Sequence, residues 1–281
     1  MNKVVDLHMH TLFSDGQLTP KELIEFAKSR KVQVMCINDH DTVKGVIDAQ
    51  SIQVDGITVL CGIELSCGLA GESSVHLTGY FPPNTDFAAF QHYLDAEVNQ
   101  RRIDRGKKIV DLLIKDGFNI TWDEVMDRCK NCLPSRPRIA EVLCAHGYAT
   151  SVADAFDKYL HNDSKYYVMG NPLSLQEAIE LVHSYSGIVA LAHPWLLKQK
   201  EIVMKKVVEC GIDGMECFPP GHHRETGSEE YLSFAHTNHL IATSGSDYHG
   251  TKSPEVLPGD NIFPADEREA TMEFFKKHHI L

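Results

Sequence analysis

Short apolar segments alternate with amphipathic ones along most of the chain. The apolar segments are rich in Val, Ile and Leu, which is typical of buried β-strands. We expect strands at residues 3–7, 32–37, 57–63, 75–80, 188–192, 214–218 and 241–244. Helices are expected between them, and two open with a capping box, a Ser or Thr followed three residues later by Glu. These helices begin after Thr19 and Ser174, and others are expected at 201–210, 225–237 and 266–277. This alternation predicts an α/β fold with a mostly parallel sheet, either open or closed into a barrel.

Residues 87–169 interrupt the alternation, because they contain no convincing strand. Helices are expected at 87–116, after a capping box at Thr121, at 138–146 and at 151–159. We interpret 87–169 as an all-helical insertion carried by a scaffold made of residues 1–86 and 170–281. The alternative is a longer series of barrel helices whose strands are not recognisable.

Composition is that of an ordinary globular protein. Of its 281 residues, 43% are hydrophobic and 23% are charged. A chain of this length can bury a hydrophobic core without disulfides. Its 39 acidic and 27 basic residues give a net charge of -12, which argues against a duplex-binding module but not against a small phosphorylated ligand. No signal peptide or membrane span is expected, so we predict a cytoplasmic protein with reduced cysteines. Cys129 and Cys132 form half of a zinc motif, but no second pair follows at the right spacing.

Histidine is unusually frequent, with 16 residues, and its placement follows the strands. Every expected strand except 214–218 carries His, Asp or Glu at or near its C-terminal end, where barrel enzymes assemble their active sites. The candidates are His8, His10, Asp15, His40, Glu64, His76, His193, Asp247 and His249. Taken singly, His76 or His193 is more typical of a hydrogen-bonded core residue. Six histidines and three carboxylates converging on one rim instead predict a metal site.

These motifs resemble the PHP (polymerase and histidinol phosphatase) phosphoesterases. The resemblance spans residues 4–250 and rests on His8-x-His10 with Asp15, Asn38-Asp39-His40-Asp41, Gly62-Ile63-Glu64, His76, Ala192-His193-Pro194 and Gly245-Ser246-Asp247-Tyr248-His249-Gly250. The insertion is similar to that of the nucleoside 3',5'-bisphosphate phosphatase branch, through Ser135-Arg136-Pro137-Arg138-Ile139-Ala140 and the segment 153–160. The resemblance implies a distorted (β/α)7 barrel of PHP type that holds three divalent metal ions.

The resemblance also implies how the ligands are shared among the metals. The three sets are His8, His10, Glu64 and Asp247; Glu64, His76 and His193; and Asp15, His40 and His249. Nitrogen and oxygen ligands without thiolate suit manganese, our first choice, and also iron or zinc. Adjacent divalent ions lower the pKa of a bridging water towards neutrality, and the phosphate oxygens would bind across the metals while hydroxide attacks phosphorus.

Basic residues outside the cluster are candidates for substrate contact. Arg136 matches the branch's arginine and can grip phosphate oxygens in bidentate fashion, although a surface arginine is the alternative. His222 lies where the family has a histidine near the phosphate and could donate a proton to the leaving oxygen, but His223 makes the register ambiguous. Arg138 stands where the branch tends to have histidine, and Asn38 where threonine is usual. Because Arg138 adds a positive charge where the branch has histidine, the nucleotide specificity stays open.

The leading hypothesis is an enzyme, a metal-dependent phosphoesterase acting on a small nucleotide such as a nucleoside 3',5'-bisphosphate. One alternative is 5'→3' exoribonuclease activity on short RNA. Histidinol phosphate hydrolysis and amide hydrolysis are weaker alternatives. A different class is an inactive barrel that binds nucleotide or metal as a sensor, against which the intact ligand set argues. We expect neither a duplex DNA partner nor a membrane partner.

Overall fold

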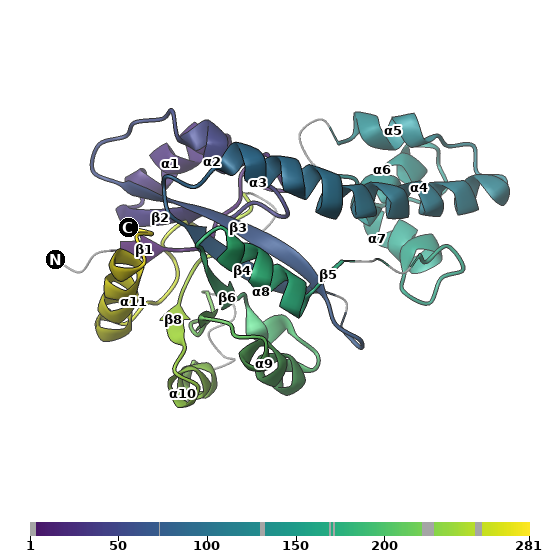
Figure 1. Cartoon of the computed structure of the whole chain (residues 1–281). Coiled ribbons are helices and arrows are strands. Elements are labelled where there is room, and N and C mark those ends of the chain that lie inside the picture. Colours follow the sequence, from purple (N-terminus) through teal and green to yellow (C-terminus); the bar gives the residue numbers. More distant parts are fainter. Residues whose placement is uncertain are drawn as a thin grey trace. The chain divides into compact units, whose positions relative to one another are not determined.

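The structure, a computed structural model of the whole chain, divides into two compact units. One comprises Met1–His92 and Leu173–Leu281, and the other comprises Tyr93–Pro172. Residues 4–72, 74–129, 133–168, 170, 172–220, 228–250 and 255–281 are described (Figure 1). We call the unit of Met1–His92 and Leu173–Leu281 the barrel unit, and the unit of Tyr93–Pro172 the helical unit.

The barrel unit is built on a curled, mixed β-sheet. Its strands are β1 (Val4–Asp6), β2 (Val32–Ile37), β3 (Thr58–Gly68), β4 (Val75–Phe81), β5 (Leu173–Ser174), β6 (Ile188–Leu191), β7 (Gly214–Glu216) and β8 (Ile241–Thr243). Their order is β1-β2-β3-β4-β6-β7-β8, with the short β5 paired to the far end of β3. Backbone hydrogen bonds beyond the strand ends link the two edges, from Leu7 N to Ser244 O (3.0 Å) and from Asp247 N to His8 O (2.9 Å). The curled sheet therefore forms the distorted α/β barrel that the sequence predicts.

Strand β4 runs antiparallel to both of its neighbours, β3 and β6. The other pairs along the sheet are parallel. The start of β4 consequently lies at the same rim as the ends of the parallel strands. His76, the second residue of β4, reaches this rim from the N-terminal end of its strand, so our expectation that it lies near a C-terminal strand end was wrong.

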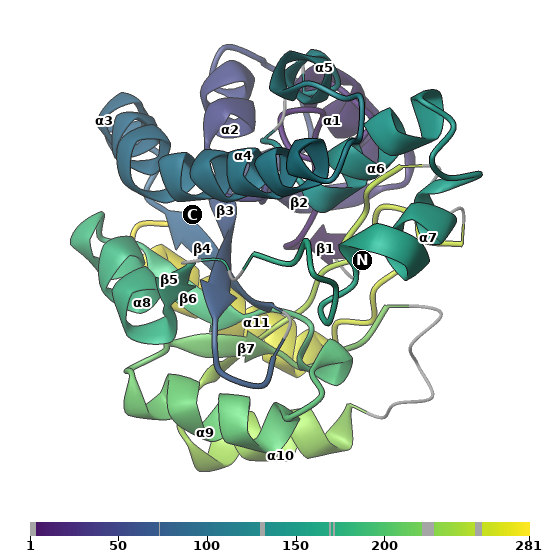
Figure 2. The ribbon, with the colours of Figure 1, turned by 90° about the vertical axis from the view of Figure 1, so that its right-hand side faces the viewer.

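Helices pack along the outside of the sheet (Figures 1 and 2). They are α1 (Pro20–Ser29), α2 (Lys44–Ala49), α3 (Phe87–Tyr93), α8 (Leu175–Ser184), α9 (Lys200–Glu209), α10 (Glu229–Thr237) and α11 (Ala265–Lys277), with a 3₁₀ turn, η3 (Pro194–Leu196). Helix α1 packs on β2, α8 on β3, β4 and β6, and α10 and α11 on the last strands. The capping boxes expected in this unit both form, at Thr19 with Glu22 and at Ser174 with Glu177, as does the one expected at Thr121 in the helical unit. Among the described residues, no helix is both long enough and apolar enough to span a membrane.

The helical unit contains helices and no strand among its described residues. Its elements are η1 (Leu94–Asn99), a π-helix that continues α3, then α4 (Gln100–Lys115), α5 (Trp122–Asp127), α6 (Arg136–Ala145), α7 (Val152–Ala155) and a second π-helix, η2 (Phe156–Leu160). A buried apolar cluster holds these helices together, with Val110, Leu113, Val125 and Leu143 fully enclosed. The unit therefore has a hydrophobic core of its own.

Candidate metal centre

The nine candidate ligands all lie within the described residues, and the fold brings them together at one rim of the barrel. Each has a side-chain nitrogen or oxygen within 3.2 Å of another member of the set. The rim collects residues that follow β1, β2, β6 and β8, together with residues of β3 and β4. Segments far apart in sequence thus supply one cluster because parallel strands end at a common edge.

Glu64 occupies the middle of the cluster and is fully buried. One of its oxygens, Oε1, lies 3.0 Å from His76 Nδ1 and 2.8 Å from His193 Nε2. The other, Oε2, lies 3.2 Å from His10 Nε2 and 3.0 Å from His40 Nδ1. Among the described residues, Oε2 has no hydrogen-bond partner in spite of its burial. A buried carboxylate oxygen in this state is costly unless a cation neutralises it.

Three groups of side chains place potential ligand atoms within 4.8 Å of one another. The groups are His8, His10, Glu64 and Asp247; His10, Asp15, His40 and His249; and His40, Glu64 and His76. The first equals the set expected for one metal, and the second adds His10 to another expected set. In the third, His40 takes the place expected for His193, although His193 Nε2 lies only 3.3 Å from His76 Nδ1. The division of ligands among individual metals stays a prediction.

The donor atoms fit a divalent metal in both chemistry and spacing. Two ligands that bind one ion at about 2.0–2.2 Å in a tetrahedral arrangement lie roughly 3.3–3.6 Å apart. Observed separations are close to this, such as 3.1 Å between His8 Nε2 and His10 Nε2 and 3.2 Å between His249 Nε2 and Asp15 Oδ1. All the donors are imidazole nitrogens and carboxylate oxygens, a set that manganese, iron and zinc accept.

Opposite charges in this cluster stabilise one another strongly. Burial lowers the pKa of His10, but hydrogen bonds to Asp247 and Glu64 outweigh burial and raise that pKa to about 10. Burial raises the pKa of Glu64, yet the surrounding histidines, His40 foremost, hold it well below its usual range. Burial lowers the pKa of His40 itself to about 3, against the opposing attraction of Glu64. The site is therefore built to hold positive charge around Glu64, which suits bound cations.

The backbone at two of these residues is unusual. His193 has a φ of 29° and Asp247 a φ of 56°, in the left-handed region that non-glycine residues rarely occupy. Such conformations cost on the order of 1–3 kcal/mol and persist where surrounding contacts enforce them. Asp247 is held by its N–H, which donates to His8 O at 2.9 Å. Strained backbone at a cluster of this kind is typical of a functional site.

Buried carboxylates behind the cluster hold its loops in place. Asp39 accepts hydrogen bonds from Thr11 N (2.7 Å), Thr11 Oγ1 (2.6 Å) and Ser14 Oγ (2.7 Å), which fixes the turn before Asp15. Asp6 accepts from Ser246 N (2.9 Å) and Gly259 N (2.8 Å), which fixes the segment before Asp247. Burial raises the pKa of both carboxyl groups, and these hydrogen bonds oppose the rise.

Sequence reasoning missed Glu216, which is buried and lies 2.8 Å from His8 Nδ1 through its Oε1. The sequence pattern predicts no acidic or histidine residue at the end of the strand expected at 214–218. That interpretation was wrong, because β7 ends two residues earlier than expected and Glu216 is its last residue. A carboxylate inside an apolar strand segment was the signal that could have identified it.

Two candidate substrate contacts, Arg136 and Arg138, lie in the helical unit and have different hydrogen-bond partners. Arg136 Nη1 donates to Leu160 O (3.0 Å) and to Asn162 Oδ1 (2.8 Å), and its guanidinium lies over the rings of Phe156 and Tyr167. Arg138 instead pairs with Glu141 at 2.8 Å. The positive charge of Arg136 thus has only neutral hydrogen-bond acceptors among the described residues. His222 and His223 lie outside the described residues.

Arg105 is a further basic residue beside Arg136 that the sequence did not single out. Its Nε donates to Val168 O at 2.9 Å, and its guanidinium lies 5.7 Å from the centre of the Tyr167 ring. Burial and then the neighbouring Arg136 lower the pKa of Arg105. Two guanidinium groups therefore share one tyrosine within the helical unit, an arrangement that an anion would stabilise.

Comparison with protein families decides the classification. The model of the PHP domain matches residues 6–192, about two thirds of the chain. The chain belongs to the PHP family. It is accordingly a metal-dependent phosphoesterase, and the buried His, Glu and Asp cluster is able to bind metal.

Known relatives of this PHP protein have more than one activity. The 5'-3' exoribonuclease Rnm of Salmonella typhimurium is 29% identical over 254 residues, covering 88% of this chain and 85% of the relative. The 3',5'-nucleoside bisphosphate phosphatase of Chromobacterium violaceum is 28% identical, covering 87% of both chains. A solved structure from Bifidobacterium adolescentis, assigned as a metal-dependent phosphoesterase, matches with a TM-score of 0.74 at 30% identity and 96% coverage of both chains. The resemblance noted in the sequence is confirmed, and the substrate stays open.

Proposed function

We propose that the protein hydrolyses phosphate esters of small nucleotides, with nucleoside 3',5'-bisphosphates as the leading substrates, at a centre of three divalent metal ions. The observation that carries this proposal is the fully buried Glu64, whose two oxygens face different histidines and whose Oε2 has no hydrogen bond among the described residues. A carboxylate so placed is suited to bridging two metals. Manganese is our first choice, with iron or zinc as alternatives.

The nine candidate ligands would hold these metals in the three sets expected from the sequence. When bound, divalent ions supply a water of lowered pKa and neutralise charge on the phosphate. The chain's own groups orient the ligands: Asp39 fixes the turn that carries Asp15, and Asp6 fixes the segment that carries Asp247. Preorganisation of this kind avoids reorganisation during the reaction.

Two arginines of the helical unit favour a substrate that carries more than one negative charge. Arg136 and Arg105 lie over the same tyrosine, and both donate only to neutral oxygens among the described residues. A guanidinium without a carboxylate partner is available to a phosphate. We propose Arg136 as a phosphate contact and Arg138, with its nearby Glu141, as a residue that tunes specificity.

The test is phosphate release from purified protein loaded with manganese. Adenosine 3',5'-bisphosphate should release inorganic phosphate, and His8→Ala should lose that activity together with metal binding. A matched control is His236→Ala, since His236 pairs with Glu267 on the surface at 2.9 Å and lies outside the ligand set. Absence of turnover across a broad panel of phosphate esters, with metal occupancy confirmed, would refute the proposal.

A second candidate is 5'→3' trimming of short RNA. It is favoured by the relatives that carry that activity, Rnm of Salmonella typhimurium among them. The same metal chemistry serves both reactions, because each breaks a phosphate ester. A ladder assay with a short RNA labelled at its 3' end separates the candidates: stepwise loss of 5' nucleotides at a rate above that of bisphosphate hydrolysis would make the RNA the preferred substrate.

A further inference from the structure

Glu216 is a buried charged residue that belongs to none of the candidate ligand groups found among the described residues. It is 1% exposed, and the burial of a carboxylate costs several kcal/mol unless strong partners compensate. Its placement at the end of β7, beside the metal cluster, therefore requires an explanation from its contacts.

Both carboxylate oxygens of Glu216 are engaged, each with a different candidate metal ligand. Oε1 lies 2.8 Å from Nδ1 of His8, and Oε2 accepts the backbone N–H of His193 at 2.7 Å. The rings of these two histidines stack with centroids 5.9 Å apart. One side chain from β7 thus connects the ligand that follows β1 with the ligand that follows β6.

The contact with His8 determines which ring nitrogen carries the proton. An ionised carboxylate can only accept a hydrogen bond, so His8 Nδ1 donates, and in the neutral ring that would bind a metal Nε2 keeps the lone pair. That Nε2 is the atom that faces the cluster, 3.2 Å from Glu64 Oε2 and 3.1 Å from His10 Nε2. This is the tautomer that a metal ligand needs.

The contact with His193 acts on the backbone. The φ of His193 is 29°, a conformation that costs on the order of 1–3 kcal/mol for a non-glycine residue. A hydrogen bond from its N–H to a buried carboxylate offsets part of that cost, because charge-assisted bonds are stronger than neutral ones. The ring nitrogen Nδ1 of His193 has no hydrogen-bond partner among the described residues. Its ring is therefore oriented through the backbone and through Glu64.

We infer that Glu216 is a positioning residue of the metal centre, which sets the His8 tautomer and the His193 backbone so that both rings turn Nε2 toward Glu64. This inference rests on the proposed metal site. Carboxylates that orient ligating histidines contribute roughly 10–100-fold to metal affinity in other proteins. We expect an effect of that size here.

The test uses Glu216→Gln in the full chain. An amide has one accepting oxygen and one donating nitrogen, so it can satisfy one of the two donors, His8 Nδ1–H or His193 N–H, but not both. The Mn²⁺ and Zn²⁺ affinities of wild type and variant are measured by competition with a chromogenic chelator. In the Zn²⁺-loaded proteins, nitrogen-15 NMR follows the His8 Nδ1 proton and its exchange with water. The variant should bind metal at least tenfold more weakly and exchange this proton faster.

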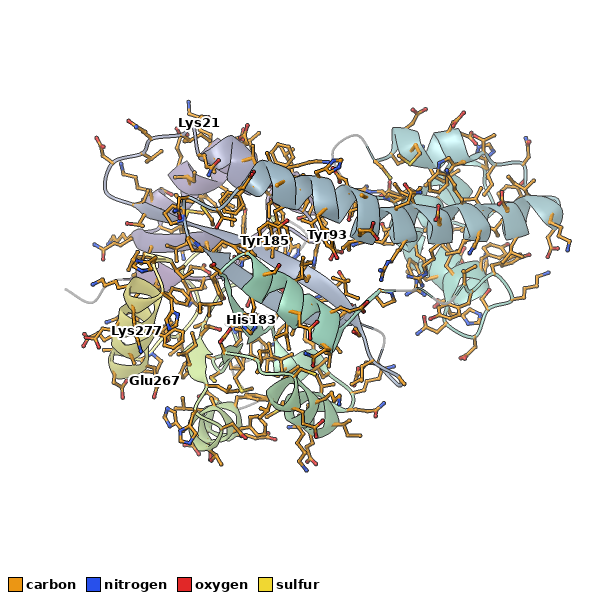
Figure 3. All side chains as sticks on the ribbon, in the orientation of Figure 1. Lys21, Tyr93, His183, Tyr185, Glu267 and Lys277 are labelled. Atoms are coloured by element: carbon orange, nitrogen blue, oxygen red, sulfur yellow. The ribbon has the colours of Figure 1, made fainter. Side chains whose placement is uncertain are left out.

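Asp213→Asn provides a matched control from the same unit. Asp213 Oδ2 also accepts from a backbone N–H, that of Val189 at 2.9 Å, and lies 2.8 Å from a histidine ring nitrogen, His183 Nε2. His183 lies at the end of α8 (Figure 3), outside the ligand set. This substitution should lower the melting temperature and leave metal affinity within twofold of wild type.

The outcomes separate the inference from the proposed function. If wild type binds metal and Glu216→Gln folds with unchanged affinity and unchanged His8 proton exchange, Glu216 has a structural role only and the inference is wrong. If wild type itself binds no divalent metal, the proposed function fails first. If the Gln variant does not fold, Glu216→Asp is used in its place. Asp keeps the charge but moves the carboxylate oxygens away from both donors, so the inference again predicts weaker metal binding and faster exchange of the His8 Nδ1 proton.

Discussion

Glu64 is the single residue on which the metal centre depends most. Its carboxylate lies within 3.2 Å of ring nitrogens of five histidines: His8, His10, His40, His76 and His193. Glu64→Gln keeps the volume but removes the charge that would hold divalent ions in the proposed centre. We expect phosphate release to fall by at least roughly 100-fold, since metals contribute several kcal/mol to such reactions.

Measurement of metal content by elemental analysis, beside activity, checks this prediction. Glu180→Gln is the control, because Glu180 lies on the exposed face of α8 and bonds only to Gln176 among the described residues. Wild-type metal content and wild-type turnover in Glu64→Gln would contradict the bridging role.

Three buried cysteines and the half-buried Cys61 allow a prediction about pH. Burial raises the pKa of Cys61 to about 11 and raises those of Cys36, Cys67 and Cys217 well above the ordinary value. At pH 8 only about one Cys61 in a thousand would be a thiolate, the form that alkylating reagents attack. Iodoacetamide should therefore label these four cysteines slowly in the native protein and rapidly in denaturant, as mass spectrometry of peptides would show.

The raised pKa values of these cysteines also determine how the free energy of unfolding changes with pH. The folded protein keeps its thiol protons to higher pH than the unfolded chain does, so the free energy of unfolding should fall as pH rises from about 9 toward 11. Replacement of Cys61 by Ser should weaken this dependence. Equal labelling of Cys61 in native and denatured protein at pH 8 would show that it is not protected.

At the level of residues, the sequence identified the side chains that cluster at the rim better than the residues that hold them in place. Strand position and residue type singled out His8, Glu64 and Asp247, because few other reasons place such groups at strand ends. Glu216 was missed, since its role depends on contacts with His8 and His193, more than twenty positions away in sequence. Long-range partners of this kind leave no local pattern in the chain.

At the level of elements, hydrophobic patterns located the main strands but not their directions. A period of two residues is the same for parallel and antiparallel strands, so nothing local revealed that β4 is antiparallel. The short β5 and α2 were also missed, because two and six residues carry too little pattern. The helix expected at 87–116 is present as α3, η1 and α4, with a π-helical middle that its composition does not indicate.

Closure of the barrel depends on a close approach between the segment after β8 and the segment after β1. A Cβ added at Gly245 would lie 2.2 Å from the Cβ of His8 and 2.6 Å from its backbone nitrogen. Backbone cannot give way as a flexible side chain can, so Gly245→Ala should cost about 1–3 kcal/mol of stability. It should also weaken metal binding, because His8 is displaced.

Chemical denaturation and chelator competition test the Gly245 prediction together. Gly170→Ala is the control, since an added Cβ there would meet nothing nearer than 3.4 Å. An unchanged denaturation midpoint in Gly245→Ala would show that the two segments can move apart without cost.

The capping box of α8 gives a prediction that concerns stability alone. Ser174 Oγ accepts from Glu177 N at 3.2 Å, and Glu177 accepts from Ser174 N at 2.7 Å. Ser174→Ala removes one of these bonds and should cost about 1 kcal/mol, without change in metal affinity. Ser184→Ala at the other end of the helix should have a smaller effect, because its hydroxyl only donates to Leu181 O. Equal denaturation midpoints of the two variants would argue against the capping contribution.

At the level of the whole molecule, the net charge of the chain and the groups that line the site describe different properties. The chain carries -12 overall, yet its cluster surrounds Glu64 with histidines and lowers that residue's pKa. Overall charge describes long-range behaviour, such as repulsion of duplex nucleic acid, whereas short-range contacts decide what a buried site binds. A phosphoesterase for small anions is compatible with the acidic overall charge and with the histidine-rich site.

The two units have separate cores, so damage to one should leave the other folded. Leu143 is fully buried in the core of the helical unit, and Leu143→Ala should cost about 2–5 kcal/mol there. The candidate ligands belong to the barrel unit, so metal affinity should stay within twofold of wild type. Hydrogen–deuterium exchange should show lost protection within residues 93–172 and retained protection in β2, β3 and β4.

Leu77→Ala, in β4 beside His76, is the reciprocal variant and should weaken metal binding. Loss of protection throughout the chain in Leu143→Ala would instead mean that the two units unfold as one.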